Sequence, residues 1–346
     1  MSTPRVTVIM PAYNCRPYLP EAIEAILHQT YRDFEFLIID DGSTDGSGDI
    51  LSSYARKDSR IVLAPNEQNV GIIHSLNKGL DLARGDYVAR MDADDICKPT
   101  RLEKQVAYMD SHSSVDVCGC WLQLFGNSTA HVWYYPEDDA TIRCLLLFHS
   151  SMPHATVMLR RSVFEEHLLR YQEDYMHAED YALWVYASKV LRFANIPEVL
   201  YLYRRYDGNV TQVFEQEKMI ATARVRREQL ERLGLDFGED EFALHERIST
   251  WDFLSSRTFV KNTETWLRKL KQANDISRLY PEPEFSATLG EKWLLCCQGA
   301  SENSFWGWMA FLLSPVSRFL PHMRESALML GKLCLRNAAG RMWCGR

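Results

Sequence analysis

Short apolar segments alternate with amphipathic ones along the first third of the chain. The apolar runs have the composition of buried strands, whereas the segments between them carry apolar residues three and four positions apart, as helices do. Strands are expected at residues 5–10, 34–39, 61–64 and 86–91, and helices at 18–29, 49–55 and 72–83. This alternation predicts an α/β fold with a mainly parallel, doubly wound sheet.

The pattern loses its regularity further along the chain and then changes character. Strands are expected at 115–125, 133–136, 154–158, 192–196 and 199–204, with helices at 101–112, 141–149, 161–167 and 178–191. After about residue 212 only helical segments follow, at 214–233, 241–254, 263–279 and 285–297. We therefore expect an α/β domain at 1–212, a helical region at 213–300 and a distinct tail at 301–346.

Polar clusters follow three of the predicted strands, at residues 11–14, 40–45 and 92–95. In doubly wound sheets, ligands bind outside the carboxyl ends of the strands. Asp92 and Asp94 are two positions apart and leave the strand on the same side, which suits Mg²⁺ or Mn²⁺ bound between protein and phosphate. An acidic turn before the next helix fits this segment equally well, but such a turn would have to recur at three strand ends.

Phosphate-binding loops of the common types are absent from the sequence, since neither GxGxxG nor GxxxxGK[ST] follows any predicted strand. A metal ion on Asp94 would supply the missing positive charge. Glu179 and Asp180 open a predicted helix, where the helix dipole favours anions, so a purely structural role fits that pair too.

Composition excludes several other classes of protein. The formal net charge of −7 argues against a nucleic-acid binder, and the nine scattered cysteines include no paired CxxC motifs of a structural zinc site. An odd cysteine number without a secretory signal suggests a reduced, cytoplasmic protein. No apolar run is long enough to span a bilayer.

The last segment is locally basic. From Pro315 onward, arginine and lysine outnumber the acidic residues, apolar residues recur at helical spacing, and a Trp-rich segment lies just upstream. A basic amphipathic helix of this kind can bind a membrane surface, whereas the alternative is a helix that packs on the protein's own core. Both interpretations remain open at this point.

Four ordered motifs now stand out: VTVIMPAYN, LIIDDGSTDGS, NVGIIHSLNKGLDLARGDYVARMDADD and AEDYALW. In this order and spacing they resemble an inverting family 2 glycosyltransferase of the GT-A type, over roughly residues 5–211. The resemblance implies a nucleotide-diphosphate sugar donor, usually a UDP-sugar, and Mn²⁺ or Mg²⁺ as cofactor. It also implies an acceptor hydroxyl on a glycan or a lipid-linked oligosaccharide.

The resemblance further implies roles for individual residues. Asp180 would be the catalytic base, Asp94 with Asp92 would hold the metal, and His154 would lie on the acceptor side. The remaining predicted residues would bind the nucleotide sugar: Pro11, Ala12, Tyr13, Asp40, Asp41, Asp92, Asp94 and Glu179. These roles are chemically sound, because Asp40 can accept a hydrogen bond from a uracil N–H and a single carboxylate can deprotonate the acceptor.

Two positions depart from the family pattern. Many relatives carry Arg where this chain has Leu76, and His where it has Tyr206. If those residues contact phosphate or metal in relatives, this chain lacks the contact, and Arg204 or Arg205 could replace it.

Three functions therefore compete. The first is an inverting glycosyltransferase of surface-polysaccharide or lipopolysaccharide biosynthesis, peripheral at the inner face of the cell membrane. The second is a nucleotidyltransferase, which would release pyrophosphate. The third is a nucleotide-sugar-binding protein without catalysis.

Overall fold

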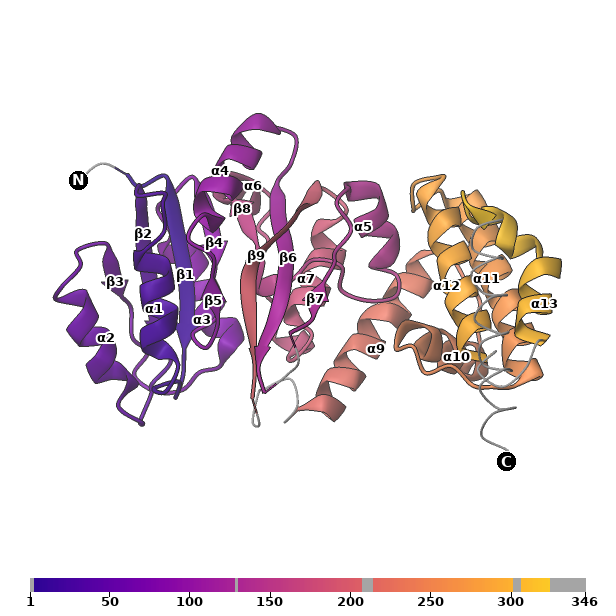
Figure 1. Ribbon diagram of the computed structural model, residues 1–346, viewed down its shortest axis with the longest axis horizontal. Coiled ribbons are helices and arrows are strands. Elements are labelled where there is room, and N and C mark those ends of the chain that lie inside the picture. Colours follow the sequence, from indigo (N-terminus) through magenta and orange to yellow (C-terminus); the bar gives the residue numbers. More distant parts are fainter. Residues whose placement is uncertain (1–2, 128–129, 207–213, 301–305, 324–346) are drawn as a thin grey trace, which may run out of the picture. The chain divides into compact units, whose positions relative to one another are not determined.

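The computed structural model describes residues 3–127, 130–206, 214–300 and 306–323 of the chain. The chain divides into two compact units. The first comprises Met1–Ile142 with Ser150–Thr222, and the second comprises Arg143–His149 with Ala223–Arg346. The first unit contains the sheet and the second is helical (Figure 1).

The described residues of the first unit form one sheet of nine strands with the order β3-β2-β1-β4-β8-β6-β9-β5, and β7 pairs with β6. The strands are β1 (Val6–Ala12), β2 (Phe34–Asp40), β3 (Ile61–Leu63), β4 (Tyr87–Arg90), β5 (Ile96–Cys97), β6 (Val117–Gly126), β7 (Val132–Trp133), β8 (Met158–Arg160) and β9 (Phe193–Arg205). Strands β1 to β4 pair in parallel, as do the long strands β6 and β9, which lie side by side in Figure 1.

Helices cover both faces of this sheet. One face packs against α1 (Leu19–Leu27), α2 (Ser47–Ala55) and α4 (Arg101–Ser111), and the other against α3 (Ile72–Leu82). The remaining helical segments of this unit are α5 (Asp139–Leu145), α6 (Arg161–Glu166), α7 (Glu179–Ala187) and the 3₁₀ turns η1 (His154–Thr156) and η2 (Glu173–Tyr175). The expected doubly wound sheet is confirmed, with antiparallel strands added at β5, β7 and β8.

Several local expectations were wrong, each for a physical reason. Residues 96–97, where no strand was expected, form β5 because they pair with Tyr201 and Leu202 of β9. The strand expected at 154–158 is a 3₁₀ turn followed by β8, and the two strands expected at 192–204 are one continuous β9. Pairing with distant strands decides these cases, and a single segment does not contain that information.

The second unit has its own hydrophobic core. Its helices are α10 (Glu239–Ser249), α11 (Arg257–Ser277), α12 (Glu284–Ala300) and α13 (Trp306–Leu313), followed by the 3₁₀ turn η3 (Pro315–Phe319), while α9 (Glu215–Arg232) runs from the first unit into it. Residues 143–149 were assigned to the first domain from sequence. They belong to the second unit because Cys144, Leu147 and Phe148 are buried in its core.

The Trp-rich segment and the start of the basic tail contribute apolar side chains to this core. Phe311, Val316 and Leu320 are buried in the second unit, so these apolar positions serve the fold. Residues 324–346, which carry most of the predicted basic helix, lie outside the described residues, as do 207–213 at the expected domain boundary. No helix in the described ranges is both long and apolar enough to cross a membrane.

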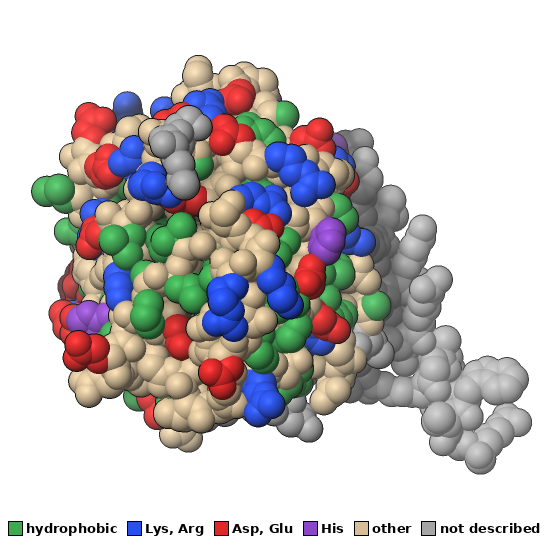
Figure 2. Space-filling view, turned by 90° about the vertical axis from the view of Figure 1, so that its left-hand side faces the viewer, with side chains coloured by type: hydrophobic (Ala, Val, Ile, Leu, Met, Phe, Trp, Pro, Cys, Tyr) green, Lys and Arg blue, Asp and Glu red, His purple; other side chains and the backbone are tan. Residues whose placement is uncertain are grey.

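Figure 2 views the molecule from the side that carries α2 and β3 in Figure 1. On the described part of this face, acidic and basic side chains are interspersed and apolar ones lie between them. A broad basic surface of the kind that binds nucleic acid is not present on this part of the molecule.

Candidate active site

The loops that follow β1 and β2 are joined by hydrogen bonds. The Asn14 main-chain N–H donates to the Ser43 hydroxyl (3.1 Å), and the Thr44 N–H donates to the Asn14 side-chain oxygen (2.9 Å). Asn14 adopts a left-handed conformation (φ 48°), which Asn tolerates better than most residues. These bonds fix the two strand ends relative to each other.

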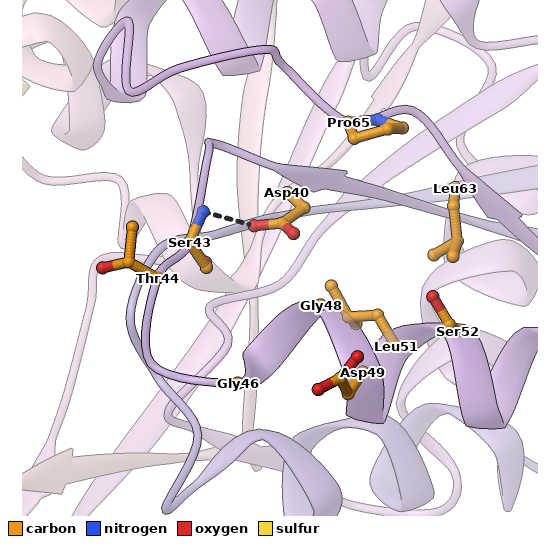
Figure 3. A pocket seen from close by; sticks show the side chains of 10 residues that line it. All are labelled: Asp40, Ser43, Thr44, Gly46, Gly48, Asp49, Leu51, Ser52, Leu63 and Pro65. Atoms are coloured by element: carbon orange, nitrogen blue, oxygen red, sulfur yellow. Dashed lines mark hydrogen bonds between the residues drawn. The ribbon is translucent and has the colours of Figure 1, made fainter.

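A cavity of about 380 Å³ opens beside the end of β2 (Figure 3). Asp40, the last residue of β2, lines it, and one carboxylate oxygen of Asp40 accepts a hydrogen bond from the Ser43 N–H (3.1 Å). The other lining residues are Ser43, Thr44, Gly46, Gly48, Asp49, Leu51, Ser52, Leu63 and Pro65. The cavity is therefore formed by the β2–α2 loop, the start of α2 and the segment after β3.

The other residues predicted at the nucleobase are placed differently. Pro11 and Ala12 are buried at the end of β1, Tyr13 is half exposed, and none of the three lines the cavity. Asp41 is buried, and its carboxylate accepts hydrogen bonds from the Asn66 side chain and from the N–H groups of Val70 and Gly71. Asp41 thus holds the loop before α3.

Asp92 is paired with Arg90, the last residue of β4. The guanidinium makes two contacts with the carboxylate, of 2.7 and 2.6 Å. Arg90 is itself buried, with 9% of its surface exposed. Because a buried cation already neutralises Asp92, its carboxylate is less available to a metal ion than the prediction assumed.

Asp94 has no ion pair with any described residue. The Tyr206 hydroxyl donates a hydrogen bond to it (2.9 Å). Burial, and then the neighbouring Asp92, raise the pKa of Asp94 from its ordinary 3.8 to about 6. A bound cation would relieve this unfavourable ionisation, so the residue fits the predicted metal.

Asp94 alone would not hold a metal. The described ranges contain no group of three or more His, Cys, Asp or Glu side chains arranged around a metal position. Mg²⁺ and Mn²⁺ are commonly held by one or two carboxylates together with substrate phosphates. The residues present therefore suit a metal that arrives with a diphosphate.

Arg204 has partners within the protein, and a contact of Arg204 or Arg205 with phosphate stays a prediction. The Arg204 guanidinium donates to the main-chain oxygen of Asp94 (2.6 Å), pairs with Glu21 and lies over the rings of Tyr18 and Phe125. Its N–H donates to Asp95, a fully buried carboxyl whose pKa burial raises well above the ordinary value.

Glu179 and Asp180 open α7, as expected, and both are largely buried. Burial, and then Asp180, raise the pKa of Glu179 to about 7, and burial raises the pKa of Asp180. A nearby Arg90 charge opposes both of these shifts, and it also opposes the shift of Asp94. The buried Arg90 is therefore the common neighbour of the acidic groups that follow β4 and those that begin α7.

The end of β2 lies beside the same group of acids. Burial raises the pKa of the Cys15 thiol to about 12, and the charges of Asp94, Asp45 and Asp40 add to this rise. Cys15 is thus a common neighbour of Asp40 and Asp94. These shared electrostatic neighbours agree with the expectation that the acidic residues at 40–45, 92–95 and 179–180 lie in one region.

His154 lies in the same region, with a mostly buried ring. Its Nε2 is 2.8 Å from the Tyr171 hydroxyl, and burial followed by the Arg90 charge lowers its pKa well below the usual value, so the imidazole is neutral. Asn77 exchanges two hydrogen bonds with the Tyr171 main chain (2.9 and 3.0 Å). Leu76, where relatives carry Arg, is buried in the core and offers no polar contact.

Sequence reasoning missed Arg90, Tyr171 and the partnership between Tyr206 and Asp94. Arg90 had a signal: a charged residue in an otherwise apolar strand, two positions before an aspartate on the same face. Tyr171 had none, because its place depends on Asn77, which is 94 residues away in the chain.

The chain is similar in sequence to known glycosyltransferases. A family model described as Glycosyl transferase family 2 matches residues 7–168. An uncharacterized glycosyltransferase of Haemophilus influenzae is 35% identical over 247 residues, which cover 67% of this chain and 76% of that protein. The putative teichuronic acid biosynthesis glycosyltransferase TuaG of Bacillus subtilis is 43% identical over 110 residues, or 32% of this chain and 44% of TuaG.

Solved structures share the fold. A crystal structure of S. aureus TarS in complex with UDP-GlcNAc matches with a TM-score of 0.58 at 18% identity, covering 97% of this chain and 92% of that one. The mannosyltransferase PcManGT of Pyrobaculum calidifontis, in complex with GDP-Man and Mn²⁺, matches with a TM-score of 0.53 at 17% identity, covering 100% and 89%. The expected fold class, with a helical C-terminal region, is confirmed.

Proposed function

The chain belongs to glycosyl transferase family 2, and from this premise we propose that it is an inverting glycosyltransferase that uses a UDP-sugar donor. The acceptor is a hydroxyl of a glycan or lipid-linked oligosaccharide in surface-polysaccharide biosynthesis. TuaG, whose name refers to teichuronic acid biosynthesis, supports the polysaccharide part. What supports the proposal is that Asp94 and Asp180, two partly buried carboxylates without an ion pair among the described residues, both have a raised pKa that the charge of Arg90 opposes.

Asp40 and Asp94 bind the donor in this proposal. Asp40 lines the cavity beside β2 and has one carboxylate oxygen to offer to a uracil N–H, while Asp41 shapes the adjoining loop. Asp94, oriented by Tyr206, faces the diphosphate, and Asp92 approaches the ribose. A divalent cation on Asp94 would supply positive charge to the leaving diphosphate.

Asp180 acts as general base. It removes the proton of the acceptor hydroxyl while that oxygen attacks the anomeric carbon from the side opposite the leaving UDP, which inverts the configuration. A general base works best when its pKa is close to the working pH, and burial moves the pKa of Asp180 upward from its ordinary value. Glu179, whose pKa of about 7 leaves it partly protonated, can donate to a sugar hydroxyl.

The test measures UDP release from a panel of UDP-sugars with Mn²⁺, Mg²⁺ or EDTA, together with UDP binding by titration calorimetry. Asp180→Asn should bind Mn²⁺ and UDP as the parent does but lose about a hundredfold or more in turnover. Asp40→Ala should lose UDP binding. Asp33→Asn is the matched control, because it makes the same chemical change at the exposed opposite end of β2 and should alter neither quantity.

The outcomes separate the competing functions. Full turnover by Asp180→Asn would contradict the assigned base. Release of pyrophosphate in place of UDP would indicate a nucleotidyltransferase, and UDP binding without turnover on any acceptor would indicate a binding protein.

We also propose that the protein works at the inner face of the cell membrane. Support comes only from the sequence of the basic tail, most of which lies beyond the described residues. Co-sedimentation with phosphatidylglycerol vesicles should fall sharply when residues 324–346 are removed. Equal sedimentation of the full and shortened chains would refute a tail-mediated contact.

A further inference from the structure

An aromatic surface adjoins the proposed catalytic centre. The ring of Trp133, on β7, stacks against the ring of Tyr203, on β9, with centroids 6.2 Å apart and planes inclined by 24°. Trp133 keeps 38% of its surface exposed, although burial of so large an apolar side chain would be favourable. We call Trp133 and Tyr203 the aromatic shelf.

The shelf lies close to residues that the proposed reaction uses. Three residues after Tyr203, the Tyr206 hydroxyl donates to the Asp94 carboxylate (2.9 Å). Two residues after Trp133, Tyr135 packs against the same hydrophobic core as Tyr203, and burial followed by the charge of Asp180 raises the pKa of its phenol. The shelf is therefore connected to Asp94 through one tyrosine and to Asp180 through another.

The segment that carries Trp133 is anchored to β6 through contacts of Trp121. The indole N–H of Trp121, on β6, donates to the main-chain oxygen of Tyr135 (2.9 Å), and the Trp121 ring meets the Tyr134 ring edge-on at 4.9 Å. Strand pairing adds to this, since Trp133 lies opposite Leu122 of β6. These contacts anchor the backbone of the segment, and stacking on Tyr203 orients the Trp133 ring, so the ring loses less conformational entropy when a ligand stacks on it.

A pyranose ring has the complementary chemistry. One face of many sugars presents C–H groups that carry partial positive charge, and the face of an aromatic ring is negative. Stacking removes apolar surface on both partners from water, while the sugar hydroxyls at the rim stay free to bond polar groups. Neither a phosphate nor an unbranched lipid chain makes comparable use of a flat aromatic face beside a carboxylate.

We propose that Trp133 and Tyr203 form an acceptor subsite that stacks on the C–H face of a pyranose ring, so that the acceptor presents a sugar residue to Asp180. This inference rests on the glycosyltransferase function proposed above and assigns the residues that receive the terminal sugar of its acceptor. A bare polyprenyl phosphate or a protein hydroxyl would leave the shelf empty.

The test uses octyl glycopyranosides of glucose, galactose, mannose and N-acetylglucosamine as probes, with octanol as the sugar-free comparison. Binding to the full chain is measured by saturation-transfer NMR in the presence of UDP and Mn²⁺. At least one glycoside should bind and octanol should not. Trp133→Ala should weaken that glycoside about tenfold or more, whereas Trp133→Phe, which keeps an aromatic face, should weaken it only a few-fold.

Two further measurements keep the shelf separate from the donor site and from folding. UDP affinity should be the same in Trp133→Ala and the parent. Tyr186→Ala removes an exposed aromatic side chain from α7 and should leave glycoside binding unchanged.

Several results would overturn the inference. They are glycoside binding that is unaffected by Trp133→Ala, an equal loss of UDP affinity in that variant, and binding of octanol as tight as that of the glycosides. If the parent binds UDP but no glycoside, the shelf fails while the proposed function stands. If it does not bind UDP, the proposed function itself fails.

Discussion

Replacing Asp94 by asparagine should stabilise the protein in the absence of donor while abolishing transfer. The change removes a charge but keeps the shape, and the new amide oxygen can still accept from Tyr206. The rise in the pKa of Asp94 from 3.8 to about 6 means that ionising the group costs the folded state about 3 kcal/mol, because one pKa unit is worth about 1.4 kcal/mol. A neutral asparagine side chain at this position has no such cost.

The sign of the pH dependence follows from proton binding. Between pH 3.8 and about 6, the folded protein holds a proton on Asp94 that the unfolded chain has released, so this carboxyl makes the parent less stable as the pH rises. The advantage of Asp94→Asn should be close to zero near pH 4, grow through this window and reach its full value above pH 6.

Urea unfolding at several pH values measures the difference directly, with Asp33→Asn as control. Saturating Mn²⁺ and UDP should then reverse the order, because ligand at a thousandfold excess over its Kd adds about 4.1 kcal/mol to the parent and none to a variant that cannot bind it. The reasoning is refuted if the two proteins are equally stable at pH 8 without ligand, or if their difference does not change with pH.

Four further predictions concern neighbouring residues. Tyr206→Phe removes a hydrogen bond that lowers the pKa of Asp94, so the midpoint of Mn²⁺–UDP binding against pH should move upward by about one unit in calorimetric titrations. Arg101→Met should lower the unfolding free energy by about 2–4 kcal/mol in urea, because this fully buried guanidinium bonds the main-chain oxygen at the end of β4 (2.7 Å). Asp95→Asn should keep both activity and stability to within about 1 kcal/mol, because burial already favours the neutral acid. Gly42→Ala should cost about 1–3 kcal/mol and lower the melting temperature, because φ is +72° and the new Cβ would lie 2.5 Å from a backbone carbon.

The sequence was most informative where local chemistry and strand order agree. Apolar strands that end in acidic residues predicted the parallel half of the sheet and placed Asp40 and Asp94 at the carboxyl ends of its strands. The four ordered motifs predicted the family. These features depend on short stretches of chain, and a strand fully buried on both faces has a composition that few other elements share.

What the sequence could not supply depends on distant partners. β5 is a strand only because β9 runs beside it, and Tyr171 is positioned by Asn77. Residues 143–149 have the same helical pattern whichever core they enter, and their burial in the second unit is decided by Phe148 and its neighbours there. The shelf was likewise invisible, because Trp133 and Tyr203 are 70 positions apart in the numbering.

The aspartates after β4 show why residue identity alone does not define a role. Asp92 is already paired with Arg90, and Asp95 is buried deeply enough to favour its neutral form. Asp94 differs from both, since it has a hydroxyl partner and no cation among the described residues. At neutral pH the segment therefore carries one uncompensated negative charge, on Asp94, and burial together with the neighbouring Asp92 makes that charge costly. A cation that arrives with the diphosphate removes the cost, so the same arrangement that destabilises the empty protein favours the loaded one.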